Sequence, residues 1–193
     1  MKRHAAVLTI ALACVAVPAL AQSGMTIKAG ASFGNVSNRG LLPGNLGTRT
    51  GFAGGLSLAL LGGDPLRLSI EGLYAQRGVG SSSDTSSRRL DYIDVPAYLR
   101  FTLPTPGIAP FAYAGPQVSF EVRCRAGMSA CPDDGRPKTT YAGVIGAGVR
   151  LGHPGLSLEG RYVYGLTDLK LNTVTSSSSY QTRSFLLLAG ISF

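Results

Sequence analysis

The chain has 193 residues, of which 15% are charged and 45% hydrophobic, with 26 glycines and a formal net charge of +8. A disordered chain combines low hydrophobicity with high net charge, so this composition excludes intrinsic disorder. The glycines lack the three-residue period of collagen. A soluble domain usually carries about 25% charged residues, and the shortfall here calls for a physical reason.

Residues 1–21 have the pattern of a secretory signal peptide. Lys2 and Arg3 precede an apolar run from Ala5 to Leu20, and residues 19–21 form an A-x-A cleavage site. The run is short for a membrane-spanning helix, which needs about 20 residues. We therefore expect cleavage after Ala21 and one mature domain over residues 22–193.

Export determines how the cysteines are interpreted. Cys14 lies in the predicted signal peptide, which leaves Cys124 and Cys131 in the mature chain. An even pair in an oxidising compartment predicts a disulfide. No histidine or further cysteine lies nearby in the sequence to complete a tetrahedral metal site. We expect no metal and no cofactor.

From residue 25 onward, apolar residues recur at every second position, which is the period of a β-strand with one apolar face. No run beyond residue 21 is long enough for a transmembrane helix. The alternation predicts eight strands of about ten residues, the length that crosses a bilayer when tilted. The predicted strands are residues 25–34, 52–60, 66–75, 92–103, 112–123, 140–151, 156–166 and 184–193.

The connections between these strands alternate strictly between long and short. The short ones are residues 62–65, 104–109 and 153–155, and the long polar ones are residues 36–50, 78–90, 124–139 and 168–182. Tight turns on one side, long loops on the other and an even strand number are typical of outer-membrane barrels. Serine-rich segments at 81–87 and 176–179 predict flexible loop tips.

Each predicted strand has one apolar and one polar face, and polarity alone does not decide which face lies inside. A soluble barrel of the lipocalin kind would place the apolar face inside. The export signal favours the opposite arrangement. So do aromatic residues near both ends of the apolar face, as in interfacial girdles: Tyr74, Tyr162, Tyr164, Phe101 and Phe193. The sequence thus predicts an all-β, eight-stranded antiparallel up-and-down transmembrane β-barrel.

The polar face would then fill a lumen just wide enough for side chains. Buried charges are costly unless they pair, so we expect a lumen ion-pair network. Glu71 and Glu159 lie at similar depth and could each meet an arginine from a neighbouring strand. A conducting or proton-relaying pathway is the alternative to this structural network. The candidate members are Lys28, Arg67, Glu71, Asp94, Tyr98, Arg100, Glu121, Arg150, Glu159 and Arg161.

Several short motifs give the mature chain a resemblance to a known family. They are residues 27–30, 51–55, 71–78, 90–96 and 114–116, in this order and spacing. The chain resembles the outer membrane protein beta-barrel family, the small porin-like group that includes PorT-type proteins. The resemblance implies the fold and the outer-membrane location, but no single activity. Within strand 92–103, Pro96 implies a bulge.

The C-terminal residue and the loops indicate partners. Phe193 at the end of an amphipathic strand resembles the signal that the bacterial barrel-assembly machinery reads. Basic residues scattered over the loops could contact lipopolysaccharide phosphates or an acidic extracellular ligand. They lack the clustering and aromatic platforms of nucleic-acid binding. The basic loop residues are Arg39, Arg49, Arg88, Arg89, Arg125, Arg136, Lys138 and Lys170.

No catalytic constellation is visible in the mature chain. Its single histidine, His153, lies in a predicted turn, and Asp133, Asp134 and Asp168 lack cation-binding spacing. We therefore expect a monomeric, non-enzymatic outer-membrane protein of a Gram-negative bacterium with a structural or surface-interaction role. The alternatives are a narrow porin-like channel for small solutes and an enzyme at the barrel rim.

Overall fold

A computed structural model describes residues 24–36, 46–81, 88–126, 129–131, 138–152, 155–167, 169–173, 176–180 and 182–193. The predicted signal peptide, His153, Asp133, Asp134 and Asp168 lie outside the described residues. Within those residues, no helix has the length and apolar character needed to cross a membrane.

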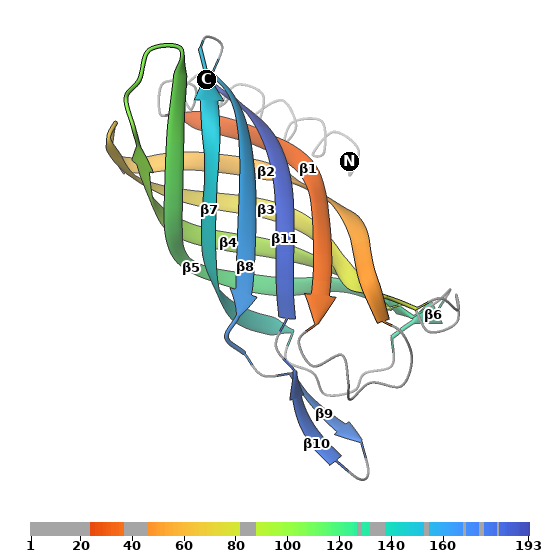
Figure 1. Ribbon diagram of the computed structural model, residues 1–193. Coiled ribbons are helices and arrows are strands. Elements are labelled where there is room, and N and C mark those ends of the chain that lie inside the picture. Colours follow the sequence, from red (N-terminus) through yellow and green to blue (C-terminus); the bar gives the residue numbers. More distant parts are fainter. Residues whose placement is uncertain are drawn as a thin grey trace, which may run out of the picture.

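Eight long strands form a closed antiparallel barrel (Figure 1). Each pairs with the next long strand along the chain, and β1 pairs with β11, which closes the barrel. This arrangement confirms the predicted up-and-down topology. The barrel strands are β1 (Met25–Val36), β2 (Leu46–Gly62), β3 (Leu66–Ser81), β4 (Arg88–Thr102), β5 (Ile108–Ala126), β7 (Thr139–Leu151), β8 (Leu156–Gly165) and β11 (Thr182–Ser192).

The two faces of the barrel wall differ as the alternation predicts. Apolar side chains on the outer face expose between 45% and 59% of their surface, far more than a soluble core allows: Ile27, Leu56, Leu99, Ile145, Leu158 and Leu187. The charged side chains Lys28, Glu71 and Arg161 point inward and are buried. The interior also contains apolar side chains, among them Leu73 and Leu188, although the sequence predicts a lumen filled by polar residues.

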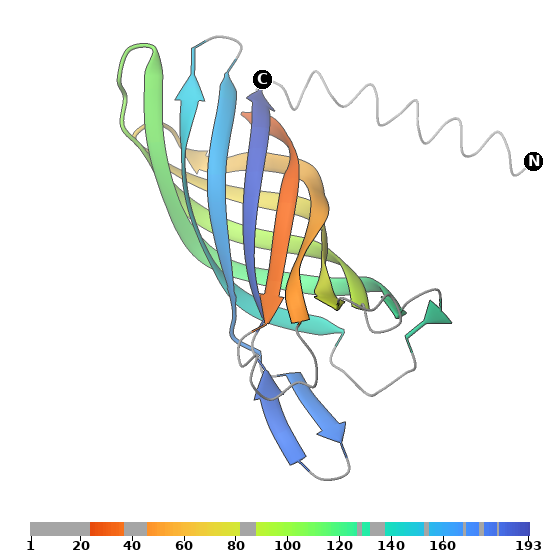
Figure 2. The same cartoon turned by 45° about the vertical axis from the view of Figure 1, so that its right-hand side comes forward.

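The strands extend further toward the long loops than predicted. β3 continues to Ser81 and β2 begins at Leu46, although loops were predicted over residues 78–90 and 36–50. The strands are predicted from their alternating apolar residues, and this alternation ends before the strands do. Backbone pairing does not need apolar side chains and continues beyond that point. The short turns and the C-terminus lie at one end of the barrel, and the extended strand ends at the other (Figure 2).

Two of the long connections contain strands of their own. β9 (Leu169–Thr173) and β10 (Ser176–Tyr180) form a hairpin that projects beyond the barrel (Figure 1). The sequence predicts a loop tip at residues 176–179, where the structure has a strand, because the backbone pairing that makes a hairpin does not require apolar side chains. The third loop contains β6 (Ser129–Ala130), which pairs with the end of β5.

Pro96 does not lie at a bulge, contrary to expectation. The register shift between β4 and β5 falls at Asp91 and Tyr92. Between β3 and β4 the register is the same before and after Pro96, with Ile70 opposite Ala97 and Leu73 opposite Asp94. The missing proline N–H is therefore accommodated by a local gap in pairing rather than by an extra residue.

Candidate functional site

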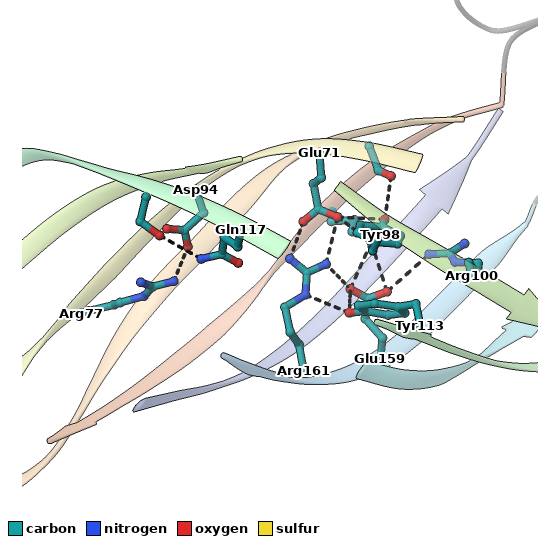
Figure 3. A network of polar contacts seen from close by, with 12 residues as sticks. Glu71, Arg77, Asp94, Tyr98, Arg100, Tyr113, Gln117, Glu159 and Arg161 are labelled. Carbon is teal, nitrogen blue, oxygen red and sulfur yellow. Dashed lines mark hydrogen bonds and ion pairs between the residues drawn. The ribbon is translucent and has the colours of Figure 1, made fainter. Parts of the chain in front are cut away.

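The barrel interior contains a network of charged side chains from strands that are not neighbours in the wall. Lys28 comes from β1, Glu71 from β3, and Glu159 and Arg161 from β8. All four face inward because they occupy the polar parity of their strands, and each lies a few residues from the turn-side end. The common depth and facing bring Glu71, Glu159 and Arg161 together across the lumen (Figure 3), and Lys28 contacts both carboxylates.

Two carboxylates and two cations alternate in this network. Arg161 makes a bidentate pair with Glu71, at 2.7 Å from Nη1 to Oε1 and 2.9 Å from Nη2 to Oε2. Its Nη2 also donates to Oε1 of Glu159 at 2.9 Å. The ammonium group of Lys28 lies 2.9 Å from Glu71 and 3.0 Å from Glu159. Each carboxylate therefore contacts both cations, the condition under which buried charges are tolerated.

Two tyrosines complete the hydrogen bonding around the carboxylates. Tyr98 donates to Glu71 at 3.1 Å, and Tyr113 donates to Glu159 at 3.0 Å while accepting from Nε of Arg161 at 2.8 Å. Their rings pack with centroids 4.6 Å apart. Together these residues form the central network: Lys28, Glu71, Tyr98, Tyr113, Glu159 and Arg161.

A glycine makes room for Tyr113. Gly146 on β7 pairs with Tyr113 on one side and with Arg161 on the other. A Cβ atom at this position would collide with the Tyr113 ring. The missing side chain therefore lets the ring lie against β7 with its hydroxyl directed at Arg161 and Glu159, which is a close-approach use of glycine within a strand.

A second group of polar side chains lies nearer the long loops and is separate from the central network (Figure 3). Arg77 pairs with Asp94, and Gln117 donates to Ser119 at 2.9 Å. These four residues are called the loop-side cluster. Three of its buried polar atoms lack a partner among the described residues: Arg77 Nε, Asp94 Oδ1 and Gln117 Oε1. This cluster is therefore less completely paired than the central network.

A third group lines the opening of the barrel at its short turns and is called the turn-side mouth. Its members are Asp64, Arg67, Arg100 and Arg150. Arg150 donates to Asp64 at 2.5 Å, which links β7 to the turn between β2 and β3, and Arg67 lies 3.9 Å from the same carboxylate. Partial burial would raise the pKa of Asp64, but the hydrogen bond and charge of Arg150, together with Arg67, hold this pKa below its ordinary value.

Arg100 is the member of the turn-side mouth that reaches the central network. Its Nη2 is 3.7 Å from Oε2 of Glu159, which is an ion pair without a hydrogen bond. The guanidinium stacks 4.3 Å above the Phe111 ring. Its Nε has no hydrogen-bond partner among the described residues.

The predicted lumen residues thus occupy several separate places. Lys28, Glu71, Tyr98, Glu159 and Arg161 come together, with Arg100 at their edge. Asp94 belongs to the loop-side cluster, Arg67 and Arg150 to the turn-side mouth, and the half-buried Glu121 lies near the loop end of β5. The expectation that each glutamate meets an arginine from a neighbouring strand is wrong: the partners of Glu71 reach it across the lumen, from β1 and β8.

The third loop carries the disulfide between Cys124 and Cys131, whose Cα atoms are 5.4 Å apart. The Cys131 N–H donates a hydrogen bond to the Cys124 carbonyl. The disulfide and this hydrogen bond link the two strands of the short β5–β6 hairpin. Among the described residues, no group of three histidine, cysteine or acidic side chains could hold a metal ion.

The closed barrel with an apolar outer face and a charged, filled interior defines a small barrel of the outer-membrane class. A family model described as "Outer membrane protein beta-barrel domain" matches residues 6–193, and the chain belongs to this family. Membership confirms the resemblance found in the sequence and implies the bacterial outer membrane as its location. In such barrels the short turns face the periplasm and the long loops face outward.

Solved structures of three outer-membrane barrels are similar to this chain. Neisserial surface protein A is 16% identical, with a TM-score of 0.53, over 88% of this chain and 97% of that chain. The outer membrane enzyme PagL is 16% identical, with a TM-score of 0.50, over 86% and 98%. OprG from Pseudomonas aeruginosa is 9% identical, with a TM-score of 0.50, over 89% and 96%. At these identities the likeness concerns the fold alone. No curated protein matches the sequence.

Proposed function

We propose that this protein is a non-conducting, non-enzymatic outer-membrane barrel whose filled lumen stiffens the wall and whose loops make contacts at the cell surface. The observation that carries this proposal is the burial of the central network. Its six side chains are between 0% and 4% exposed although they line the interior of a barrel. Residues that line a water-filled pore would keep part of their surface open to water.

The filling is both ionic and apolar. Beside the central network, apolar side chains on the inner face are no more than 3% exposed: Leu73, Val144, Val163, Leu186 and Leu188. An ion crossing the barrel would have to separate Arg161 from both carboxylates, which would leave buried charges uncompensated. This cost supports a closed lumen rather than the alternative of a narrow solute channel.

The same burial argues against chemistry at the two glutamates. Both carboxylates are occupied by cations and tyrosine hydroxyls, and neither is open to a substrate. General acid or base catalysis requires a group within hydrogen-bond reach of the substrate. The likeness to PagL concerns the fold, so an enzyme at the rim stays an alternative that lipid and peptide turnover assays of the purified protein would reveal.

The long loops carry the proposed contacts. Arg123 and Arg125 are exposed beside the disulfide that holds the third loop. Guanidinium groups match phosphate oxygens, so lipopolysaccharide phosphates or an acidic extracellular ligand are the proposed partners. Phe193, exposed at the end of β11, is the proposed signal for the barrel-assembly machinery. A monomer that loses residues 1–21 on export completes the proposal.

Planar-bilayer recording tests the closed lumen. The purified protein should give no steady single-channel steps under conditions in which a general porin conducts. Glu71→Gln should open transient steps or lower stability, because it removes one carboxylate shared by Lys28 and Arg161. Asp64→Asn is the matched control, since it removes a carboxylate at the mouth and leaves the central network intact. Steady steps from the unmodified protein would overturn the proposal in favour of a channel.

A further inference from the structure

We propose that the turn-side mouth is a binding site for a soluble phosphate-class oxyanion, held by Arg67, Arg100 and Arg150. The site opens toward the periplasm, because it lies at the short-turn end of the barrel. The inference goes beyond the surface role proposed above and does not depend on whether the lumen conducts.

The first observation is a pair of like charges in direct opposition. Arg67 on β3 lies opposite Arg100 on β4 in the ladder, and both side chains face the lumen. Like charges directly opposite each other on neighbouring strands are destabilising. Among the described residues, each has one acidic contact, and it is loose: 3.9 Å to Asp64 for Arg67 and 3.7 Å to Glu159 for Arg100.

The second observation is that both arginines have a hydrogen-bond donor without an acceptor among the described residues. The Nε atoms of Arg67 and Arg100 are buried and have no hydrogen-bond partner among the described residues. Buried N–H donors without acceptors are costly, so native proteins supply them with a partner. An oxyanion between the two guanidinium groups would relieve the repulsion, and a small shift of either side chain toward it would give these buried donors an acceptor.

The third observation is the ratio of cations to side-chain carboxylates in the ion pairs described here. The ion pairs of the central network and the mouth connect five cationic side chains to three side-chain carboxylates, so within this set the cations exceed the carboxylates by two. The five cations are Lys28, Arg67, Arg100, Arg150 and Arg161, and the carboxylates are those of Asp64, Glu71 and Glu159.

Access to the site is graded along the barrel axis. The side chains of Asp64, Arg67 and Arg150 are 25% to 29% exposed, whereas that of Arg161 is fully buried. Arg100, at 11%, lies between these limits. Because Arg67 and Arg100 face the axis and not the lipid, a soluble anion reaches them more directly than the headgroup of a lipid outside the wall does.

The chemistry of the group fits phosphate. Guanidinium groups bind phosphate and carboxylate through two parallel hydrogen bonds, and a phosphate monoester can carry both negative charges that the excess calls for. Asp64 would compete with such an anion for Arg150, because the two form a hydrogen bond in this structure.

Calorimetric titration of the purified protein with sodium phosphate, in a non-ionic detergent and a phosphate-free buffer, tests the proposal. Arg67→Gln and Arg100→Gln should each weaken binding about tenfold, because each removes charge-assisted hydrogen bonds. The control Arg123→Gln removes an exposed arginine at the opposite end and should bind like the unmodified protein. Absence of binding to the unmodified protein at 10 mM phosphate, or equal binding by all variants, overturns the proposal.

Two further arms keep the test independent of folding defects. Asp64→Asn should bind phosphate more tightly than the unmodified protein, a gain that a misfolded variant cannot produce. In lipid nanodiscs, phosphatidylglycerol should compete no better with free phosphate than phosphatidylcholine does. Binding that requires phosphatidylglycerol and resists displacement by inorganic phosphate would overturn the assignment to a soluble anion.

Discussion

The central network and the loop-side cluster both hold charged side chains inside the barrel, but the charges of the central network are paired more completely. In the central network, each carboxylate contacts two cations and a tyrosine hydroxyl. In the loop-side cluster, Asp94 contacts Arg77 through one oxygen, while its other oxygen lacks a partner among the described residues. Both clusters lie buried inside the same barrel, so they differ in how many partners each charge has and not in exposure.

The number of partners matters because both clusters are buried. Glu71, Glu159 and Asp94 are each no more than 2% exposed, so the charge of each must be satisfied by protein atoms. Two cations share each carboxylate of the central network, whereas Asp94 has one arginine among the described residues. Three variants test this contrast.

The largest effect is expected for Arg161→Met. Among the described residues it leaves Glu71 with Lys28 alone and Glu159 with Lys28 and the looser contact of Arg100, and breaking a buried ion pair usually costs about 3–5 kcal/mol. The free energy of unfolding, measured by denaturant titration in lipid vesicles, should fall by that amount. Arg183→Met is the matched control, because Arg183 is exposed and stacks on Tyr164. Equal losses for the two variants would contradict the central role of Arg161.

A smaller loss is expected for Arg77→Met. This change leaves the buried Asp94 carboxylate without its cation, but a single carboxylate can take up a proton instead of staying charged, so the loss should be nearer the cost of an unsatisfied neutral group, about 1–3 kcal/mol. The double variant Arg77→Met, Asp94→Leu should recover part of the loss, because it removes both charges together. The same unfolding titration measures both. If Arg77→Met costs more than Arg161→Met, the contrast between the two clusters is wrong.

The smallest effect is expected for Asp64→Asn at the turn-side mouth. The exposed pair with Arg150 should contribute no more than about 1 kcal/mol. Because the folded-state pKa of Asp64 is lowered, the pair stabilises above the ordinary carboxyl pKa, and this contribution is lost as the pH falls through the lowered value. The stability difference between the two proteins should therefore be present at neutral pH and vanish in strong acid. A difference that grows on acidification would contradict this linkage.

Much of the fold follows from the sequence because apolar residues recur at every second position throughout the barrel strands. The alternation of apolar residues gives the number of strands, their faces and their order, and the loop lengths give the topology. The strand ends near the loops do not follow, since β2 and β3 continue into polar sequence where the backbone still pairs. The β9–β10 hairpin lies in a serine-rich segment whose composition indicates no strand.

The sequence indicates which side chains face the lumen but not how they group. The depth of each residue depends on the stagger between strands, which the sequence does not reveal, so Arg67 and Arg150 lie at the mouth and not in the central network. Tyr113 and Arg77 also lie inside but are absent from the predicted network. Residue 77 lies beyond the predicted end of its strand, and Tyr113, unlike Tyr98, has no charged residue two positions away to mark its face.

The charged side chains of the central network come from strands that are far apart in the sequence, which has a kinetic consequence. Glu71 belongs to the first half of the chain and Arg161 to the second, and they meet across the lumen of a barrel that is closed by the pairing of β1 with β11. Contacts absent from the transition state slow unfolding while leaving the folding rate nearly unchanged. We therefore expect that loss of the ion pairs between distant strands speeds unfolding more than it slows folding.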